Sequence, residues 1–490
     1  MYPHFQFQFQ LHLHLLSLLL FIPSLFLSSS SSLVSAEQHQ LQPPQLQPQQ
    51  PQQEQHQQVQ HQRTLYASHY SGYVYSLSLT LTLNHNNIDN NNIDIIDNND
   101  NDIFSETLTQ TSSLQTCGDL PSWLTYDSST RTLYCVDESY AEGRNGSLTA
   151  LAAVGDGSLI ELAKTETRAG GVASTIYTDN NTGRKYVAIA HYQASALTTY
   201  ALPLTSNASP VQTFKYTLSK PGQIPSRQDA PHPHAVFLDP SGGFLVSPDL
   251  GADVVRVYAI STNQTVDSGG AVLHECAVFP VKAGDGPRHG VFWSSTQTNT
   301  NTNTQTQTQQ SYSSNYSYNY SNTTTLLYIV NELANTVTAY TVSYNDSSTC
   351  LSLSPNQVIT PYPNGTSIPE TANVAGIHVL DKNLYVSVRN DHAFPSEENS
   401  DSMATLAISD ETGELSFSAL TPSFGQTPRT FAINVAGDLV AIGDQVSSNV
   451  AVVKRDPRTG KLGPLVASLR VGTPGKVGES SGLSSVVWGE

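Results

Sequence analysis

The chain has 490 residues, of which only 13% are charged, and its 40 acidic side chains outnumber its 22 basic ones to give a net charge of −18. Basic faces bind phosphate backbones and anionic membrane surfaces, so this balance argues against nucleic acid and against a polybasic membrane anchor. The length allows two or three domains, or one large all-β domain with tails. The shortage of charge is uneven, because residues 294–325 hold no charged side chain and residues 1–120 hold one basic side chain, Arg63.

The N-terminus is typical of a targeting segment. Residues 15–27 form an apolar run, which is shorter than the ~20 residues needed to span a bilayer. A serine run follows and leads to Val34-Ser35-Ala36, a small-residue cleavage pattern. The segment before the apolar run carries histidines where lysine or arginine is usual. We predict a signal peptide over residues 1–36 and a secreted mature protein without a membrane span.

Sequons and cysteines are compatible with export. The chain holds nine Asn-X-Ser/Thr sequons, at Asn145, Asn180, Asn207, Asn263, Asn315, Asn319, Asn322, Asn345 and Asn364. None of the four cysteines lies in a CxxC spacing, so two disulfides are possible. Cys117, Cys135, Cys276 and Cys350 allow three connectivities. We expect Cys117–Cys135 first, because a short loop would link neighbouring strands, and two free buried thiols are the alternative to a second disulfide.

Three low-complexity tracts interrupt the chain. Residues 37–63 are rich in Gln, His and Pro, with too few apolar side chains to offset the entropy of ordering, so we expect a disordered segment. Residues 84–105 are rich in Asn and Asp, and residues 294–325 in Ser, Thr, Asn, Gln and Tyr. Both interrupt sequence typical of strands. We expect them to be loop insertions within one β domain over residues 64–490.

A repeated unit fills the sequence between these tracts. Each copy has a short β run, a Gly/Asn/Asp turn, an apolar run and then an alternating strand. Six copies begin at Trp123, Val172, His234, His289, Val374 and Arg429. Most starts are about 50–60 residues apart, close to the spacing of four-stranded propeller blades.

A seventh copy is split between the two ends of the chain. Residues 484–488 supply its first strand, and residues 65–79 supply the next two. We therefore predict an all-β fold, a seven-bladed β-propeller closed by pairing of N- and C-terminal strands. A sandwich of β-hairpins is the alternative, although the chain shows no linker between two such domains.

Polar side chains stand at the strand ends of successive copies, where blades would converge on one axis. His232 and His234 flank a proline before one first strand, and a histidine there could act as acid or base near neutral pH. Arg288 and His289 begin the next first strand, where a guanidinium suits a carboxylate or an oxyanion. Taken singly, these residues could instead be surface histidines in a turn and an arginine bound to carbonyls of its own turn.

Two further residues follow apolar strands. Glu332 stands at the end of the apolar strand LLYIV, and a buried carboxylate is costly unless it is paired, for example with Arg288. Arg389 stands at the same place in the next copy, after LYV, so we interpret the two residues as occupying equivalent repeat positions. For both residues, the alternative to a role in catalysis is a structural ion pair, such as Arg389 with Asp391. Convergence from successive blades favours one axial site.

These motifs resemble the seven-bladed propeller lactonase family, which includes 6-phosphogluconolactonase and 3-carboxy-cis,cis-muconate cyclase. The resemblance covers residues 64–490 and is carried by segments that occur in order, among them PHPHAVFLDP, GPRHGVF, YIVNELANTVTAY, LYVSVRND and PRTFAINVAGDLV. It implies a propeller with a pocket at one end of its axis. The cyclase branch implies catalytic roles for His234 (or His232), Arg288, Glu332 and Arg389. Residues 191–195 and Asp137-Glu138 depart from the family pattern.

From this resemblance we expect a secreted enzyme of the 3-carboxy-cis,cis-muconate cyclase type that acts on a small carboxylate-bearing substrate. The arginines would hold the anionic substrate, His234 or Glu332 would move the proton, and His232 and His289 would contact the substrate. This chemistry requires no metal and no organic cofactor. A 6-phosphogluconolactonase-like hydrolase and a secreted non-enzymatic binding propeller are the alternatives, and the oligomeric state is left open.

Overall fold

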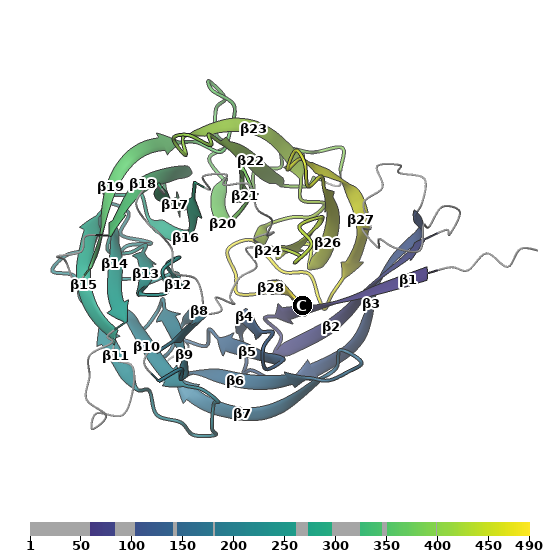
Figure 1. Ribbon diagram of the computed structural model, residues 1–490, viewed down its shortest axis with the longest axis horizontal. Helices are drawn as coiled ribbons and strands as arrows, with labels where there is room; N and C mark the ends of the chain where they lie inside the picture. The colour runs from purple at the N-terminus through teal and green to yellow at the C-terminus, as the bar shows by residue number, and fades with distance from the viewer. Residues whose placement is uncertain are drawn as a thin grey trace, which may run out of the picture. The chain divides into compact units, whose positions relative to one another are not determined.

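Seven antiparallel sheets of four strands make up the fold, as the repeats predict. The computed structural model describes residues 59–83, 103–140, 145–179, 182–260, 273–295, 324–344, 350–397 and 399–490. The predicted signal peptide and residues 37–58, 84–102 and 296–323 lie outside the described residues. Figure 1 shows the sheets arranged as blades around a ring. The described ranges contain no helix, and so none that could cross a membrane.

The blades are numbered in chain order from the first complete one. Blades 1 and 2 comprise β4 (Pro121–Asp127), β5 (Thr132–Asp137), β6 (Gly146–Ala153) and β7 (Leu159–Thr167), then β8 (Gly171–Thr178), β9 (Lys185–His191), β10 (Ala196–Ala201) and β11 (Gln212–Lys215). Blades 3 and 4 comprise β12 (Phe237–Leu238), β13 (Phe244–Asp249), β14 (Val254–Ile260) and β15 (Leu273–Pro280), then β16 (Pro287–Ser294), β17 (Thr325–Asn331), β18 (Thr336–Tyr344) and β19 (Leu351–Ile359). Blades 5 and 6 comprise β20 (Asn373–Leu380), β21 (Asn383–Arg389), β22 (Ser402–Ile408) and β23 (Leu415–Pro422), then β24 (Pro428–Ile433), β25 (Leu439–Asp444), β26 (Asn449–Arg455) and β27 (Leu462–Arg470). Blade 7 comprises β28 (Leu483–Trp488), β1 (Val59–His69), β2 (Tyr73–Leu83) and β3 (Ile103–Gln115).

Burial between blades explains the strand sequences. The second strands β5, β17, β21 and β25 are buried along their whole length, because each blade packs on both faces. Strands buried on both faces have near-continuous apolar runs in place of alternation. One apolar cluster fills each of the seven junctions between neighbouring blades, so the core is a ring of interfaces.

The split blade closes the ring as predicted. β28 pairs antiparallel with β1, with Trp488 opposite Leu65, and Figure 1 shows the two strands side by side. The hydroxyls of Ser68 and Ser484 share a 2.8 Å hydrogen bond. Ser484 also donates a 2.6 Å hydrogen bond to the carbonyl of Pro121 at the start of blade 1. The C-terminal strand thereby connects blade 7 with blade 1.

Two predicted boundaries differ from the structure. β1 begins at Val59, inside the segment expected to be disordered through residue 63, and β3 begins at Ile103, inside the insertion expected through residue 105. The physical reason is the hairpin register, which continues the β1–β2 ladder back to residue 59 opposite residue 83. Backbone pairing does not require apolar side chains, so composition alone misses these ends.

Both pairs of cysteines form disulfides, and the chain has no free thiol. Cys117–Cys135 is confirmed as a pair, although it joins the connection after β3 to β5 and not two neighbouring strands. Cys276–Cys350 joins β15 of blade 3 to the start of blade 4's outer strand. Each disulfide therefore links neighbouring blades.

Candidate active site

The predicted site residues meet at one end of the ring. In each blade the first and second strands are antiparallel, so the start of the first strand and the end of the second lie at the same end. Arg288 is the second residue of β16, Glu332 follows β17, and Arg389 ends β21. His234 lies just before β12. We call the charged and aromatic side chains gathered there the axial site.

Glu332 lies at the centre of three guanidinium groups. Its Oε1 accepts a 2.8 Å hydrogen bond from Arg227 and lies 3.1 Å from Arg389 Nη2. Its Oε2 lies 2.7 Å from Arg288 Nε, although these atoms are not aligned for a hydrogen bond. Arg288 Nη1 donates to the carbonyl of Ala375 at 3.0 Å. Glu332 and Arg288 are almost fully buried, with side-chain exposures of 3% and 2%.

Burial and charge oppose each other in this cluster. Burial alone would raise the pKa of Glu332, but the charges of Arg389, Arg227 and Arg288 outweigh it and hold that pKa well below its usual range. Burial, with repulsion from Arg389, lowers the pKa of Arg288 to about 9. Both groups are therefore charged near pH 7, and Glu332 is a poor proton carrier.

The expected repeat equivalence of Glu332 and Arg389 is wrong by one residue. Arg389 pairs with Asn373 at the start of β20, whereas Asn331, and not Glu332, pairs with Pro287 at the start of β16. Arg389 is therefore equivalent to Asn331, whose side chain bonds Thr336 and Thr338 in its own blade. The two charged residues meet because Glu332 lies one position past its strand, where the chain turns toward Arg389.

The two histidines of the PHPH segment differ in their partners. Both ring nitrogens of His232 have partners, the carbonyl of Tyr192 at 2.7 Å and Asp229 at 3.0 Å. His234 is also buried, but its Nδ1 has no hydrogen-bond partner among the described residues. His234 Nδ1 is therefore a buried ring atom whose hydrogen-bonding capacity the described residues leave unfilled. His232 supports the site through its stack on Tyr192, with 4.0 Å between ring centroids.

His289 and Trp123 bring aromatic rings from distant blades together. His289 on β16 stacks on Trp123 of β4, with 5.3 Å between their ring centroids. The ring centroids of His289 and His234 are 5.5 Å apart. Burial and the charge of Arg288 hold the pKa values of His234 and His289 well below their usual range. Both imidazoles are therefore neutral near pH 7.

Sequence reasoning assigned no role in the site to several side chains of the axial site. Arg227 comes from the irregular segment between β11 and β12, which has no repeat signal. Arg429 follows Pro428 at the start of β24, just as Arg288 follows Pro287 at the start of β16. Pro428 pairs with Asp444 and Pro287 pairs with Asn331, so the two prolines occupy equivalent positions in their blades. This repeated Pro-Arg pair was a usable signal. The others are Glu138 and the aromatic residues Tyr70, Trp123 and Tyr192.

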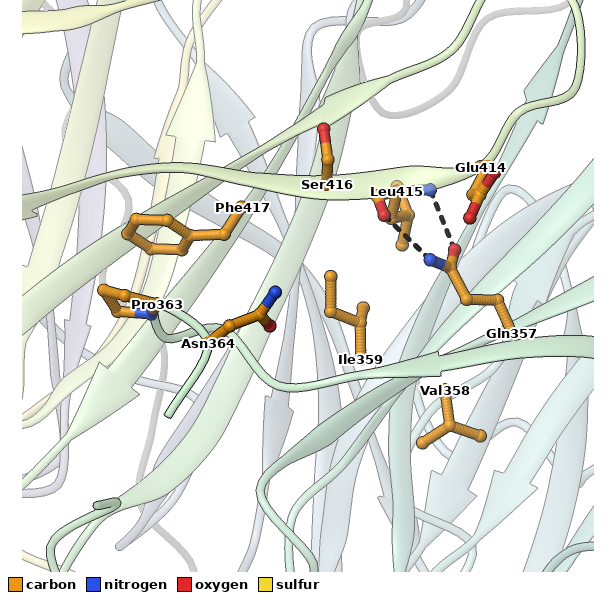
Figure 2. A pocket seen from close by; sticks show the side chains of 9 residues that line it. All are labelled: Gln357, Val358, Ile359, Pro363, Asn364, Glu414, Leu415, Ser416 and Phe417. Carbon is orange, nitrogen blue, oxygen red and sulfur yellow. Dashed lines mark hydrogen bonds between the residues drawn. The ribbon is translucent and has the colours of Figure 1, made fainter. Parts of the chain in front are cut away.

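The other described residues offer no competing centre of charged side chains. Within the described ranges, no group of three or more His, Cys, Asp or Glu side chains could hold a metal ion. A groove of about 510 Å³ lies between the outer strands β19 and β23 (Figure 2). None of the axial side chains line this groove, whose walls comprise Gln357, Val358, Ile359, Pro363, Asn364, Glu414, Leu415, Ser416 and Phe417.

Comparisons with known proteins agree with this architecture. The sequence model of the family described as "Lactonase, 7-bladed beta-propeller" matches residues 88–478. A protein of Arthroderma benhamiae named "Probable 6-phosphogluconolactonase" is 28% identical over 70% of this chain and 76% of its own length. The 6-phosphogluconolactonase of Bacillus subtilis is 24% identical over 59% of this chain and 68% of its own.

The fold also matches solved structures. The periplasmic gluconolactonase of Pseudomonas aeruginosa superposes with a TM-score of 0.61 at 22% identity, over 87% of this chain and 99% of that one. At this identity, the likeness shows a shared fold.

Proposed function

The chain belongs to the seven-bladed β-propeller lactonase family, and from this premise we propose that it hydrolyses a small anionic lactone at the axial site. The observation that carries the proposal is a set of buried guanidinium groups beside a histidine, His234, whose Nδ1 has no partner among the described residues. Guanidinium groups bind carboxylate, phosphate and oxyanion oxygens. An unpartnered imidazole nitrogen can take a proton from water.

In the proposed reaction, His234 Nδ1 removes a proton from a water molecule while the water oxygen attacks the lactone carbonyl. The carbonyl oxygen becomes an oxyanion, which Arg288 or Arg389 stabilises. The ester C–O bond then breaks, and the ring oxygen takes the proton from His234. One lactone and one water molecule give one hydroxy acid.

The electrostatics of the site suit this assignment. Burial and Arg288 hold the pKa of His234 well below its usual range, so the imidazole is neutral and can accept a proton. A bound anionic substrate would offset the arginine charges and raise that pKa toward the range of an effective base. Glu332 has three guanidinium partners, and we assign it the role of orienting them.

The relatives favour a hydrolase over a cyclase. Proteins similar to this chain are named 6-phosphogluconolactonase, so we propose a phosphorylated or carboxylated sugar lactone, with 6-phosphogluconolactone as the first candidate. The 3-carboxy-cis,cis-muconate cyclase reaction expected from the motifs has less support, because none of the similar proteins reported above carries that name.

The test is turnover by the purified protein. Acid release from 6-phosphogluconolactone, glucono-1,5-lactone and 3-carboxymuconolactone would be followed in a pH-stat and compared with spontaneous hydrolysis. We expect His234→Gln to lower kcat by about 10²- to 10⁴-fold, whereas the exposed His274→Gln leaves it unchanged. Absence of turnover with all three lactones would overturn the proposal and favour a binding propeller.

We also propose that the protein is secreted. Two disulfides use all four cysteines, and such bonds persist in oxidising compartments. Three of the sequon asparagines, Asn145, Asn207 and Asn364, are exposed. Expression of the full chain in a eukaryotic host should place it in the medium, with a mass that falls on treatment with an N-glycosidase. Retention of the protein inside the cells would contradict secretion.

A further inference from the structure

Two guanidinium groups of the axial site are incompletely paired within the described residues. Arg389 is 11% exposed, its Nη2 lies 3.1 Å from Glu332 Oε1 in an ion pair, and its Nε has no hydrogen-bond partner in the described part of the chain. Arg429 is 12% exposed, and its only ion pair with a described residue is a long one, 3.5 Å from Nη2 to Glu138 Oε2. A buried guanidinium without such partners is costly, and an anionic ligand would remove the cost.

Arg429 is held in place by residues from two other blades. Its guanidinium carbon lies 5.6 Å from the centre of the Tyr70 ring, which follows β1 of blade 7. The Tyr70 hydroxyl donates a 2.7 Å hydrogen bond to Glu138, which follows β5 of blade 1. Arg429 itself is the second residue of β24 of blade 6. The convergence of three blades on one cation indicates a built position for Arg429.

The axial site carries a surplus of positive charge. Arg227, Arg288, Arg389 and Arg429 face two carboxylates, Glu332 and Glu138. The imidazoles beside them are neutral, because burial and the arginines lower their pKa values. The surplus is two unit charges, which is close to the charge of a phosphate monoester near pH 7.

The chain segments that carry Arg389 and Arg429 are adjacent, because the Thr427 hydroxyl donates a 2.8 Å hydrogen bond to the side-chain oxygen of Asn390, the residue after Arg389. Burial lowers the pKa of Arg389 most, the charge of Glu332 raises it, and the charge of Arg429 lowers it further. The charge of Arg429 also contributes to lowering the pKa of His234, behind burial and Arg288. A group bound between Arg389 and Arg429 would therefore lie within electrostatic range of the base that we propose.

We infer that Arg389 and Arg429 form a subsite for a doubly charged oxyanion of the substrate, such as a phosphate monoester, and that Arg429 sets the preference for phosphorylated over neutral lactones. Tyr70 and Glu138 are positioning residues for Arg429. The inference rests on the proposed lactone hydrolase function for its substrate, but the subsite itself can be tested by binding alone.

The kinetic test compares two substrates that differ by one phosphate. We expect Arg429→Gln to lower kcat/KM for 6-phosphogluconolactone by about 10- to 100-fold, the effect of one lost charge-assisted contact. Turnover of glucono-1,5-lactone should fall by a clearly smaller factor, because this substrate has no phosphate to contact Arg429. Arg458→Gln is the matched control, because Arg458 is 72% exposed. Equal losses on both substrates, or no loss on either, would overturn the inference.

The binding test separates this inference from the proposed function. Calorimetry would measure 6-phosphogluconate and gluconate binding to the wild-type protein, Arg429→Gln and Arg429→Lys. We expect the preference for 6-phosphogluconate to be lost in Arg429→Gln and partly retained in Arg429→Lys, which keeps the charge. Binding by Arg429→Lys would show that a substitution at this position does not unfold the protein. Unchanged 6-phosphogluconate binding in Arg429→Gln would overturn the subsite. Binding that depends on Arg429 without lactone turnover would retain the subsite and overturn only the hydrolase.

Discussion

Arg227 donates a 2.8 Å hydrogen bond to Glu332, a residue 105 positions later in the chain. The arginine lies between blades 2 and 3, and the carboxylate lies on blade 4. Arg227 is 38% exposed whereas Glu332 is buried. The pair therefore connects an accessible segment at the edge of the axial site with its buried centre.

The partners of Glu332 should differ sharply in their contribution to stability. Replacing the buried Arg288 by Met leaves part of a buried charge uncompensated, so we expect a loss of about 3–5 kcal/mol in the free energy of unfolding. Replacing the partly exposed Arg227 by Met should cost less, about 1 kcal/mol, because solvent reaches this guanidinium and screens the pair. Urea unfolding measures both values, and equal losses would contradict the ranking.

Removal of the central carboxylate should make stability depend on added anions. In Glu332→Gln, the surrounding guanidinium groups lose their common partner, and we expect a loss of about 3–5 kcal/mol. Inorganic phosphate should then raise the Tm of the variant more than the Tm of the wild-type protein, because the anion takes the place of the carboxylate. A thermal-shift titration with phosphate tests this, with glucose as the neutral control. An equal response of both proteins would be evidence against an uncompensated cluster.

The repeats were sufficient to predict the fold. Each first strand could be located from its copy, and strands buried on both faces have apolar runs such as LLYIVN that stand out in the sequence. The split blade could be predicted because residues 484–488 and 65–79 complete one another, and the structure pairs them.

The axial site was only partly predictable. Arg288, Glu332 and Arg389 lie at strand ends, where repeat position indicates direction, and they do meet. Arg227 lies in a segment without periodicity, so only the folded chain brings it to Glu332. The offset between Glu332 and Arg389 also escaped detection, because a one-residue difference in register has no compositional signal.

Gly286 should be needed to hold Arg288 and Glu332 in position. Its φ is +63°, and an added Cβ would lie 2.4 Å from Leu333 Cγ. Its carbonyl accepts a 2.8 Å hydrogen bond from the Glu332 amide. We expect Gly286→Ala to lower both Tm and kcat/KM, because the segment that carries Glu332 must shift.

A matched glycine separates backbone strain from this clash. Gly242 has a φ of +69° and open space around its Cβ position. Gly242→Ala should therefore cost only the left-handed strain, about 1–2 kcal/mol, with kcat/KM unchanged. If Gly286→Ala has no larger effect than Gly242→Ala on stability and on kcat/KM, the proposed role of Gly286 is wrong.

Two histidines with lowered pKa values, His378 and His191, should make the fold sensitive to acid. Burial lowers the pKa of His378 to about 4 and that of His191 to about 3. Between pH 6.5 and 4 the unfolded chain therefore binds protons that the folded chain does not. The free energy of unfolding should fall as the pH falls, by about 1.4 kcal/mol per pH unit for each histidine.

Urea unfolding across that range measures the slope. His378→Gln removes one titrating group, so its slope should be smaller than that of the wild-type protein by about 1.4 kcal/mol per pH unit. The exposed His274→Gln serves as the control for loss of a histidine and should keep the wild-type slope. A wild-type slope in His378→Gln would mean that this imidazole takes up its proton as readily in the folded chain as in the unfolded one.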